Sequence, residues 1–200
     1  MTVSEQENAS AKNFISPSTP EIIQLALDVG ASHAALISTD SIPFVPELRE
    51  SCKQNSCGRY ATNWVGPPAI GEVCDLMNRV LQYSSGLVIQ TVDQLEDCFD
   101  YPGMVSARDN HKIVFRHVLN KVRAQFSDLE LLALDAGCCD ICPICTYPNE
   151  ACRFPAEAIP SVEAYGINVN PMLTSCGLKY NNGKDTVSYV GLILFGKQGI

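Results

Sequence analysis

The feature that most constrains this chain is a run of cysteines in its second half. Five cysteines lie between Cys138 and Cys152, within the stretch AGCCDICPICTYPNEACRFP of residues 136–155. Thiols this close together are metal ligands, disulfide partners, members of a redox relay or merely small apolar residues. Without Cys138 the pattern is Cys139-x2-Cys142-x2-Cys145-x6-Cys152. This regular spacing favours metal ligands over packed apolar groups.

An iron–sulfur cluster explains the spacing better than zinc does. Zinc sites usually take their thiolates from two separated Cys-x2-Cys pairs. Three thiolates on one loop, each two residues from the next, match the Cys-x2-Cys-x2-Cys run that holds a 4Fe–4S cluster in bacterial ferredoxins. We therefore predict a 4Fe–4S cluster here. Zinc is the alternative metal, and thiol or disulfide redox chemistry is a further alternative.

Four of the five cysteines are the predicted ligands. The fifth, Cys138, is expected to be an ordinary small residue at the end of a strand, with a substitute ligand as the alternative. Arg153 is expected to offset part of the charge of the cluster. Ile141 and Ile144 are expected to shield its sulfur atoms from water, while backbone N–H groups turn toward them. The predicted ligands are Cys139, Cys142, Cys145 and Cys152.

A second cysteine loop precedes the first in the sequence. Cys52 and Cys57 lie in an irregular segment of residues 39–70, which also holds Tyr60 and Trp64. Two thiols cannot complete a tetrahedral metal site by themselves. These two cysteines are therefore a possible second metal site only if other residues contribute, and simple packing of the thiols explains them equally well.

Composition limits the partners and the compartment. The 200 residues carry a formal net charge of −8, which excludes an anionic surface such as nucleic acid as the expected partner. No apolar run approaches the roughly 20 residues of a membrane-spanning helix. The N-terminal residues also lack the apolar segment of a secretory signal. We expect a cytoplasmic protein, where thiols stay reduced and ten cysteines favour metal or redox chemistry over disulfides.

Periodicity predicts one α/β or α+β domain over residues 18–200, preceded by a flexible N-terminal segment of residues 1–17. A sheet of four to five strands, flanked by helices, is expected to support the two cysteine-bearing loops. Its strand order does not follow from the sequence. Strands are predicted at residues 33–38, 86–91, 129–137 and 186–195, and helices at 18–30, 71–81, 106–126, 161–165 and 170–176.

The joint pattern resembles an uncharacterised family of predicted metal-binding proteins, a domain of unknown function common in anaerobic prokaryotes. That family carries Cys-x4-Cys-x2-Tyr, Cys-Pro-Pro, Gly-x-Cys-x2-Cys-x2-Cys, Cys-Arg-x-Pro and Ser-x-Glu-Ala-x-Gly-Ile motifs. The resemblance covers about residues 20–196. The matching stretches here are Cys52 to Tyr60, Pro67-Pro68, Gly137 to Cys145, Cys152 to Pro155, SVEAYGINV at 161–169 and the closing YVGLILF.

One position departs from the family pattern. Gly66 stands where the family has the cysteine of Cys-Pro-Pro. The resemblance therefore implies a complete metal site in the later loop and an incomplete one around Cys52 and Cys57. It implies no activity, because that of the family is itself unassigned.

Three functions fit these observations. The first is a cluster-bearing protein that transfers electrons to a partner protein or senses redox state. The second is a cluster-dependent enzyme or maturation factor that binds a small molecule beside the Tyr60 and Trp64 loop, with Arg59 and Arg153 as further lining residues. The third is a zinc-stabilised interaction module. Whether the protein is an enzyme stays open, and no catalytic residue is assigned from the sequence.

Overall fold

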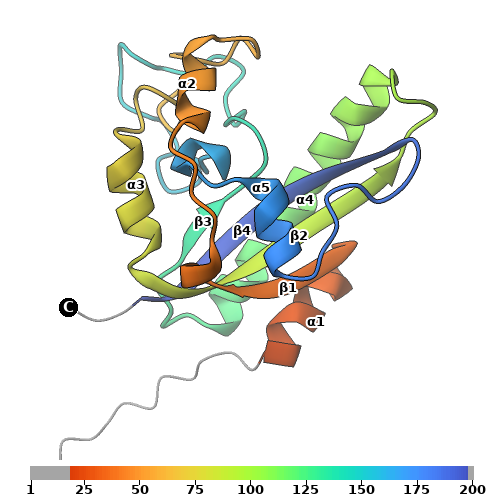
Figure 1. Cartoon of the computed structure of the whole chain (residues 1–200). Coiled ribbons are helices and arrows are strands. Elements are labelled where there is room, and N and C mark those ends of the chain that lie inside the picture. Colours follow the sequence, from red (N-terminus) through yellow and green to blue (C-terminus); the bar gives the residue numbers. More distant parts are fainter. Residues whose placement is uncertain (1–18, 198–200) are drawn as a thin grey trace, which may run out of the picture.

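The core of the fold is a four-stranded antiparallel sheet (Figure 1). The computed structural model describes residues 19–197, so the flexible segment predicted for residues 1–17 lies outside the described residues. The strand order is β1-β2-β4-β3, and β2 and β4 pair along their whole length, from Tyr83 opposite Lys197 to Gln94 opposite Thr186. The strands are β1 (His33–Ser38), β2 (Tyr83–Gln94), β3 (Leu132–Leu134) and β4 (Thr186–Lys197).

Two helices, α1 (Thr19–Val29) and α4 (Tyr101–Gln125), cover one face of the sheet. Side chains alternate along a strand, so Ile193 and Phe195 of β4 point toward these helices. Phe115 of α4 packs directly on Gly191, where a Cβ atom would lie 2.4 Å from the Phe115 ring. Glycine at this position therefore allows α4 to lie directly on the sheet.

The opposite face is covered by α3 (Val73–Val80), the 3-10 helix η2 (Glu163–Tyr165) and α5 (Val169–Ser175). Leu192 and Leu194 of β4 point to this side and pack with residues of the three helices, such as Tyr165. Strands that are buried on both faces carry continuous apolar runs. This burial explains the stretches GLVIQT in β2 and YVGLILF in β4.

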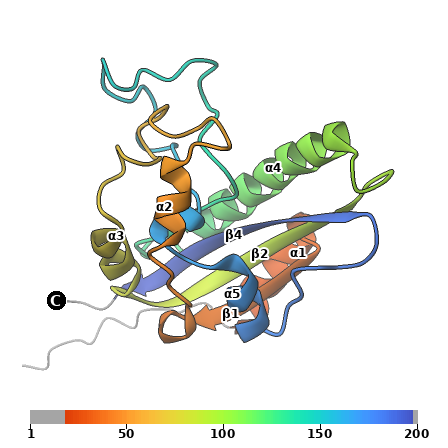
Figure 2. The same cartoon turned by 45° about the horizontal axis from the view of Figure 1, so that its top comes forward.

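Two long connections gather at one end of the molecule (Figure 2). The first, between β1 and α3, contains the 3-10 helix η1 (Thr39–Ser41) and α2 (Leu48–Lys53). The second is the irregular segment 136–160, coloured teal, between β3 and η2. These two connections carry both cysteine loops.

The predicted fold class is confirmed as α+β, in one domain with five α-helices among the described residues. Several details of the prediction were wrong. Strand β2 covers Tyr83–Gln94 where residues 86–91 were expected. The third strand has three residues where nine were expected, because β3 pairs only with Leu192–Leu194 of β4. Helix α4 begins five residues earlier than expected, and α2 was not predicted. No helix within residues 19–197 is both long and apolar enough to cross a bilayer.

Candidate metal centre

The cysteine-bearing loop, residues 136–160, leaves and rejoins the folded core at the same point. Asp135, directly after β3, donates its backbone N–H to the Pro160 carbonyl at 2.9 Å. It also accepts the backbone N–H of Val162 at 3.1 Å. The loop is therefore closed at its base by backbone hydrogen bonds, which involve none of its cysteines.

A buried polar group beneath the loop fixes this base. His111 of α4 is fully buried, and its Nε2 lies 3.2 Å from Oδ1 of Asp135. Its Nδ1 lies 2.9 Å from Oγ1 of Thr91 in β2. The same Asp135 oxygen accepts the backbone N–H of Ala136 at 2.8 Å. Three elements, α4, β2 and the end of β3, thus meet where the cysteine loop begins.

Lys112, the next residue of α4, holds the first part of the loop. Its ammonium donates to the carbonyl of Cys138 at 3.0 Å and to the carboxylate of Asp140. No functional role was predicted from the sequence for His111 or Lys112. No sequence signal marked either residue, because both lie in a continuous polar run of α4, residues 108–112.

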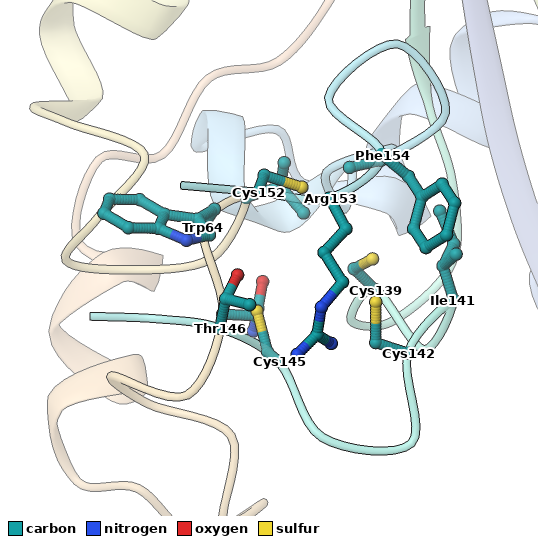
Figure 3. A pocket seen from close by; sticks show the side chains of 12 residues that line it. Trp64, Cys139, Ile141, Cys142, Cys145, Thr146, Cys152, Arg153 and Phe154 are labelled. Atoms are coloured by element: carbon teal, nitrogen blue, oxygen red, sulfur yellow. The ribbon is translucent and has the colours of Figure 1, made fainter. Parts of the chain in front are cut away.

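The four predicted ligands face one hollow, which we call the cysteine hollow (Figure 3). In the close-up, the side chains of Cys139, Cys142, Cys145 and Cys152 surround the same space, with the Arg153 side chain between them. Arg153 also donates to the Ile144 carbonyl at 3.1 Å. The structure thus brings together all four thiols and the arginine that the spacing singled out.

The environment of Cys139 is consistent with this grouping. Burial raises the pKa of its thiol, and a hydrogen bond from the Ile141 backbone N–H to its sulfur opposes that rise. The charges of Asp140, Cys152 and Cys145 raise the pKa further. The thiol of the metal-free chain is therefore kept protonated, and a metal must displace that proton to bind.

The two isoleucines of the loop behave differently from each other. Ile141 lines the cysteine hollow, where its predicted role as a shield stays a prediction. Ile144 is 81 % exposed and does not line the hollow, so the expectation that it shields the sulfur atoms was wrong. Its side chain is instead an apolar group on the surface.

The first connection, between β1 and α3, covers one side of the cysteine hollow through Trp64. Trp64 Nε1 donates to the Glu150 carbonyl at 3.0 Å, and its ring meets the Tyr147 ring edge-on with centroids 5.0 Å apart. Both contacts join the connection between β1 and α3 to the cysteine loop. Trp64 therefore helps to hold the two loops together.

Cys52 and Cys57 lie outside this hollow, in a second one of ≈ 380 Å³. Burial raises the pKa of Cys52, while Arg49 lowers it and the neighbouring Cys57 raises it. Cys138 lines the same second hollow, although the adjacent Cys139 lines the first. Within residues 19–197, no three His, Cys, Asp or Glu side chains are close enough together to hold one metal ion.

Comparison with known proteins gives the family and nothing narrower. No curated protein and no solved structure matches the chain. A family model described as "Predicted metal-binding protein (DUF2284)" matches residues 35–195, which is most of the chain and includes both cysteine loops. The chain therefore belongs to the DUF2284 family of predicted metal-binding proteins.

Proposed function

We propose that this protein binds a 4Fe–4S cluster in the cysteine hollow and uses it to exchange electrons with a partner protein. The observation that carries the proposal is that Cys139, Cys142, Cys145 and Cys152, all from one loop, face one space. When bound, such a cluster supplies one-electron redox chemistry. Arg153 brings a positive charge to the same space, where thiolate ligands would place negative charge.

The arrangement of the thiols supports a cluster over a single zinc ion. Each Zn–S bond is about 2.3 Å long, so four thiolates on one zinc lie within about 4 Å of one another. The four thiols here border a common hollow, but no three of the described ligand-type side chains are close enough to hold one ion. In a cubane, each cysteine binds a different iron atom, so its ligands lie farther apart.

The surroundings of the cysteine hollow support contact with a protein partner. Phe154, which lines the hollow, is 43 % exposed, and Ile144 at the edge of the loop is more exposed still. Apolar side chains on a surface are typical of the centre of a protein interface. The net charge of −8 would steer the protein toward a basic partner.

The test is anaerobic purification with iron, sulfide and zinc quantified together. We expect about four iron and four sulfide ions per chain, with visible absorbance that dithionite bleaches. Cys142→Ser should lose most of the iron. Cys138→Ser is the matched control and should keep it, because Cys138 lines the other hollow. One zinc without iron, or equal iron loss in both variants, would contradict the proposal.

A second candidate function is favoured by the hollow around Cys52 and Cys57. The volume of this hollow, ≈ 380 Å³, lies within the range typical of small-molecule sites. It includes Tyr60, and it shares Asn63 and Val65 with the cysteine hollow. A small molecule bound there would lie beside the metal centre, as a cluster-dependent enzyme requires. Turnover of such a molecule by the cluster-loaded protein would distinguish this function from simple electron transfer.

A further inference from the structure

The hollow around Cys52 and Cys57 is positively charged, in a protein that is acidic overall. We call it the charged hollow, and it is lined by residues from the connection between β1 and α3, from α4 and from the start of the cysteine loop. Three of these residues are cationic and one, Asp140, is anionic. The cationic residues are Arg59, Arg108 and Lys112.

Two of the three cations already have partners. Arg108 donates to Asp109 at 2.7 and 2.9 Å, and Lys112 donates to Asp140 and to the Cys138 carbonyl. The guanidinium of Arg59 differs from both, because within residues 19–197 it makes no ion pair or hydrogen bond. Its five N–H donors are thus available at the mouth of a hollow.

An unpartnered amide lies in the wall of the same hollow. Asn63 is only 5 % exposed, and its Oδ1 has no hydrogen-bond partner among the described residues. Its Nδ2 donates to Thr62 Oγ1 at 3.4 Å. Thr62 uses its own hydroxyl proton on the Arg59 carbonyl at 2.7 Å, so its oxygen is left to accept. These two hydrogen bonds orient the Asn63 amide, so that its NH₂ group points toward Thr62 and its oxygen has no partner.

Gly66 provides the space for this amide. A Cβ atom at Gly66 would lie 2.9 Å from Nδ2 and 3.1 Å from Oδ1 of Asn63, closer than side chains normally approach. Asn63 lines both hollows, and Gly66, against which its amide lies, lines only the charged hollow. A buried acceptor without a partner destabilises the fold, and a ligand with a donor group would remove that cost.

We propose that the charged hollow binds a small organic acid that also carries an O–H or N–H donor. The carboxylate meets Arg59, with Lys112 and Arg108 adding positive charge, and the donor meets Oδ1 of Asn63. This inference names the ligand class for the second candidate function. Binding itself depends only on residues of the charged hollow, whereas any use of the ligand in redox chemistry depends on the proposed cluster.

The test compares glycolate with acetate, two acids that differ in one hydroxyl group, by ligand-detected proton NMR titration of the full, anaerobically purified protein. We expect glycolate to bind about tenfold more tightly than acetate, since one satisfied buried acceptor accounts for a difference of that size. Arg59→Ala should weaken both acids about tenfold, as the loss of a charge-assisted hydrogen bond does. Asn63→Ala should remove the preference for glycolate and leave acetate binding unchanged.

Arg123→Ala is the matched control, because Arg123 is another exposed arginine but does not line the hollow. Circular dichroism checks that each variant is folded. Absence of saturable binding of both acids, equal affinity for the two, or wild-type binding by Arg59→Ala would overturn the inference. Iron is quantified on the same samples. A protein that holds iron but binds neither acid contradicts this inference alone, and one that binds glycolate without holding iron contradicts only the cluster proposal.

Discussion

Replacing His111 with leucine tests whether the buried polar group beneath the cysteine loop stabilises the fold. The change puts an apolar side chain of similar size in the place of the imidazole, so little cavity is created. It removes the partner of the Asp135 carboxylate at 3.2 Å and the partner of the Thr91 hydroxyl at 2.9 Å. Both groups are nearly inaccessible to water, with Asp135 only 4 % exposed. Solvent therefore cannot replace the lost contacts.

The expected cost of this change is about 3 kcal/mol in the free energy of unfolding. Leaving a buried polar group without its partner costs about 1–3 kcal/mol. The change does so to two groups, the Asp135 carboxylate and the Thr91 hydroxyl. Asp135 keeps the backbone N–H of Ala136 at 2.8 Å, which limits the loss. The estimate therefore lies near the lower end of the summed range.

The assay is urea unfolding followed by circular dichroism, with His111→Leu measured beside the double variant His111→Leu/Asp135→Asn. An asparagine places no charge beside the new leucine, and its side-chain oxygen still accepts the Ala136 N–H. The double variant should therefore be more stable than His111→Leu alone, although it carries one more substitution. A cost below about 1 kcal/mol for His111→Leu, or additive costs in the double variant, would refute the reasoning.

Two further predictions concern the contact between the loops and a cysteine remote from them. Trp64→Phe keeps an aromatic ring against Tyr147 but removes the indole hydrogen bond. Backbone amide hydrogen exchange in residues 146–152 should therefore accelerate about fivefold, because the loss of one hydrogen bond lowers the free energy of local opening by roughly 1 kcal/mol. Unchanged exchange there would show that the bond contributes nothing. Burial raises the pKa of Cys176 to about 11. The fraction of Cys176 present as thiolate should therefore rise about tenfold per pH unit between pH 8 and pH 10, and the rate of its alkylation should rise with it. Mass spectrometry measures this rate, with the exposed Cys98 as the reference for a thiol that the reagent reaches freely. A rate that levels off below pH 10 would contradict the raised pKa of Cys176.

Much of the fold follows from local pattern. Strand β1 has the predicted bounds, because an apolar segment lies between the end of a helix at Gly30 and the polar residues after Ser38. Helix α4 carried an overlooked start signal, since Asp100 caps it by accepting the Gly103 N–H at 2.9 Å, with a proline at the first turn. Helix α2 has no buried residue and hence no apolar face for periodicity to detect.

Other parts depend on contacts distant in sequence. The segment of residues 129–137 is apolar enough for a long strand, but after Leu134 its backbone bonds with Pro160 and Val162 in place of β4, which local sequence does not reveal. For the same reason, spacing indicated the four thiols of one loop but not that Cys138 faces Cys52 and Cys57 across a separate hollow. That juxtaposition arises only when α4 and the two connections meet.

The closed base of the cysteine loop has a consequence for how such a protein can evolve. Since Asp135, Pro160 and Val162 join the two ends of the loop by backbone hydrogen bonds, the loop is attached to the sheet at one point. Insertions or deletions between those ends change the length of a surface excursion without shifting the strands. Scaffold and site are in this sense separable, and selection can retune the metal environment while the sheet and its two helical layers stay as they are.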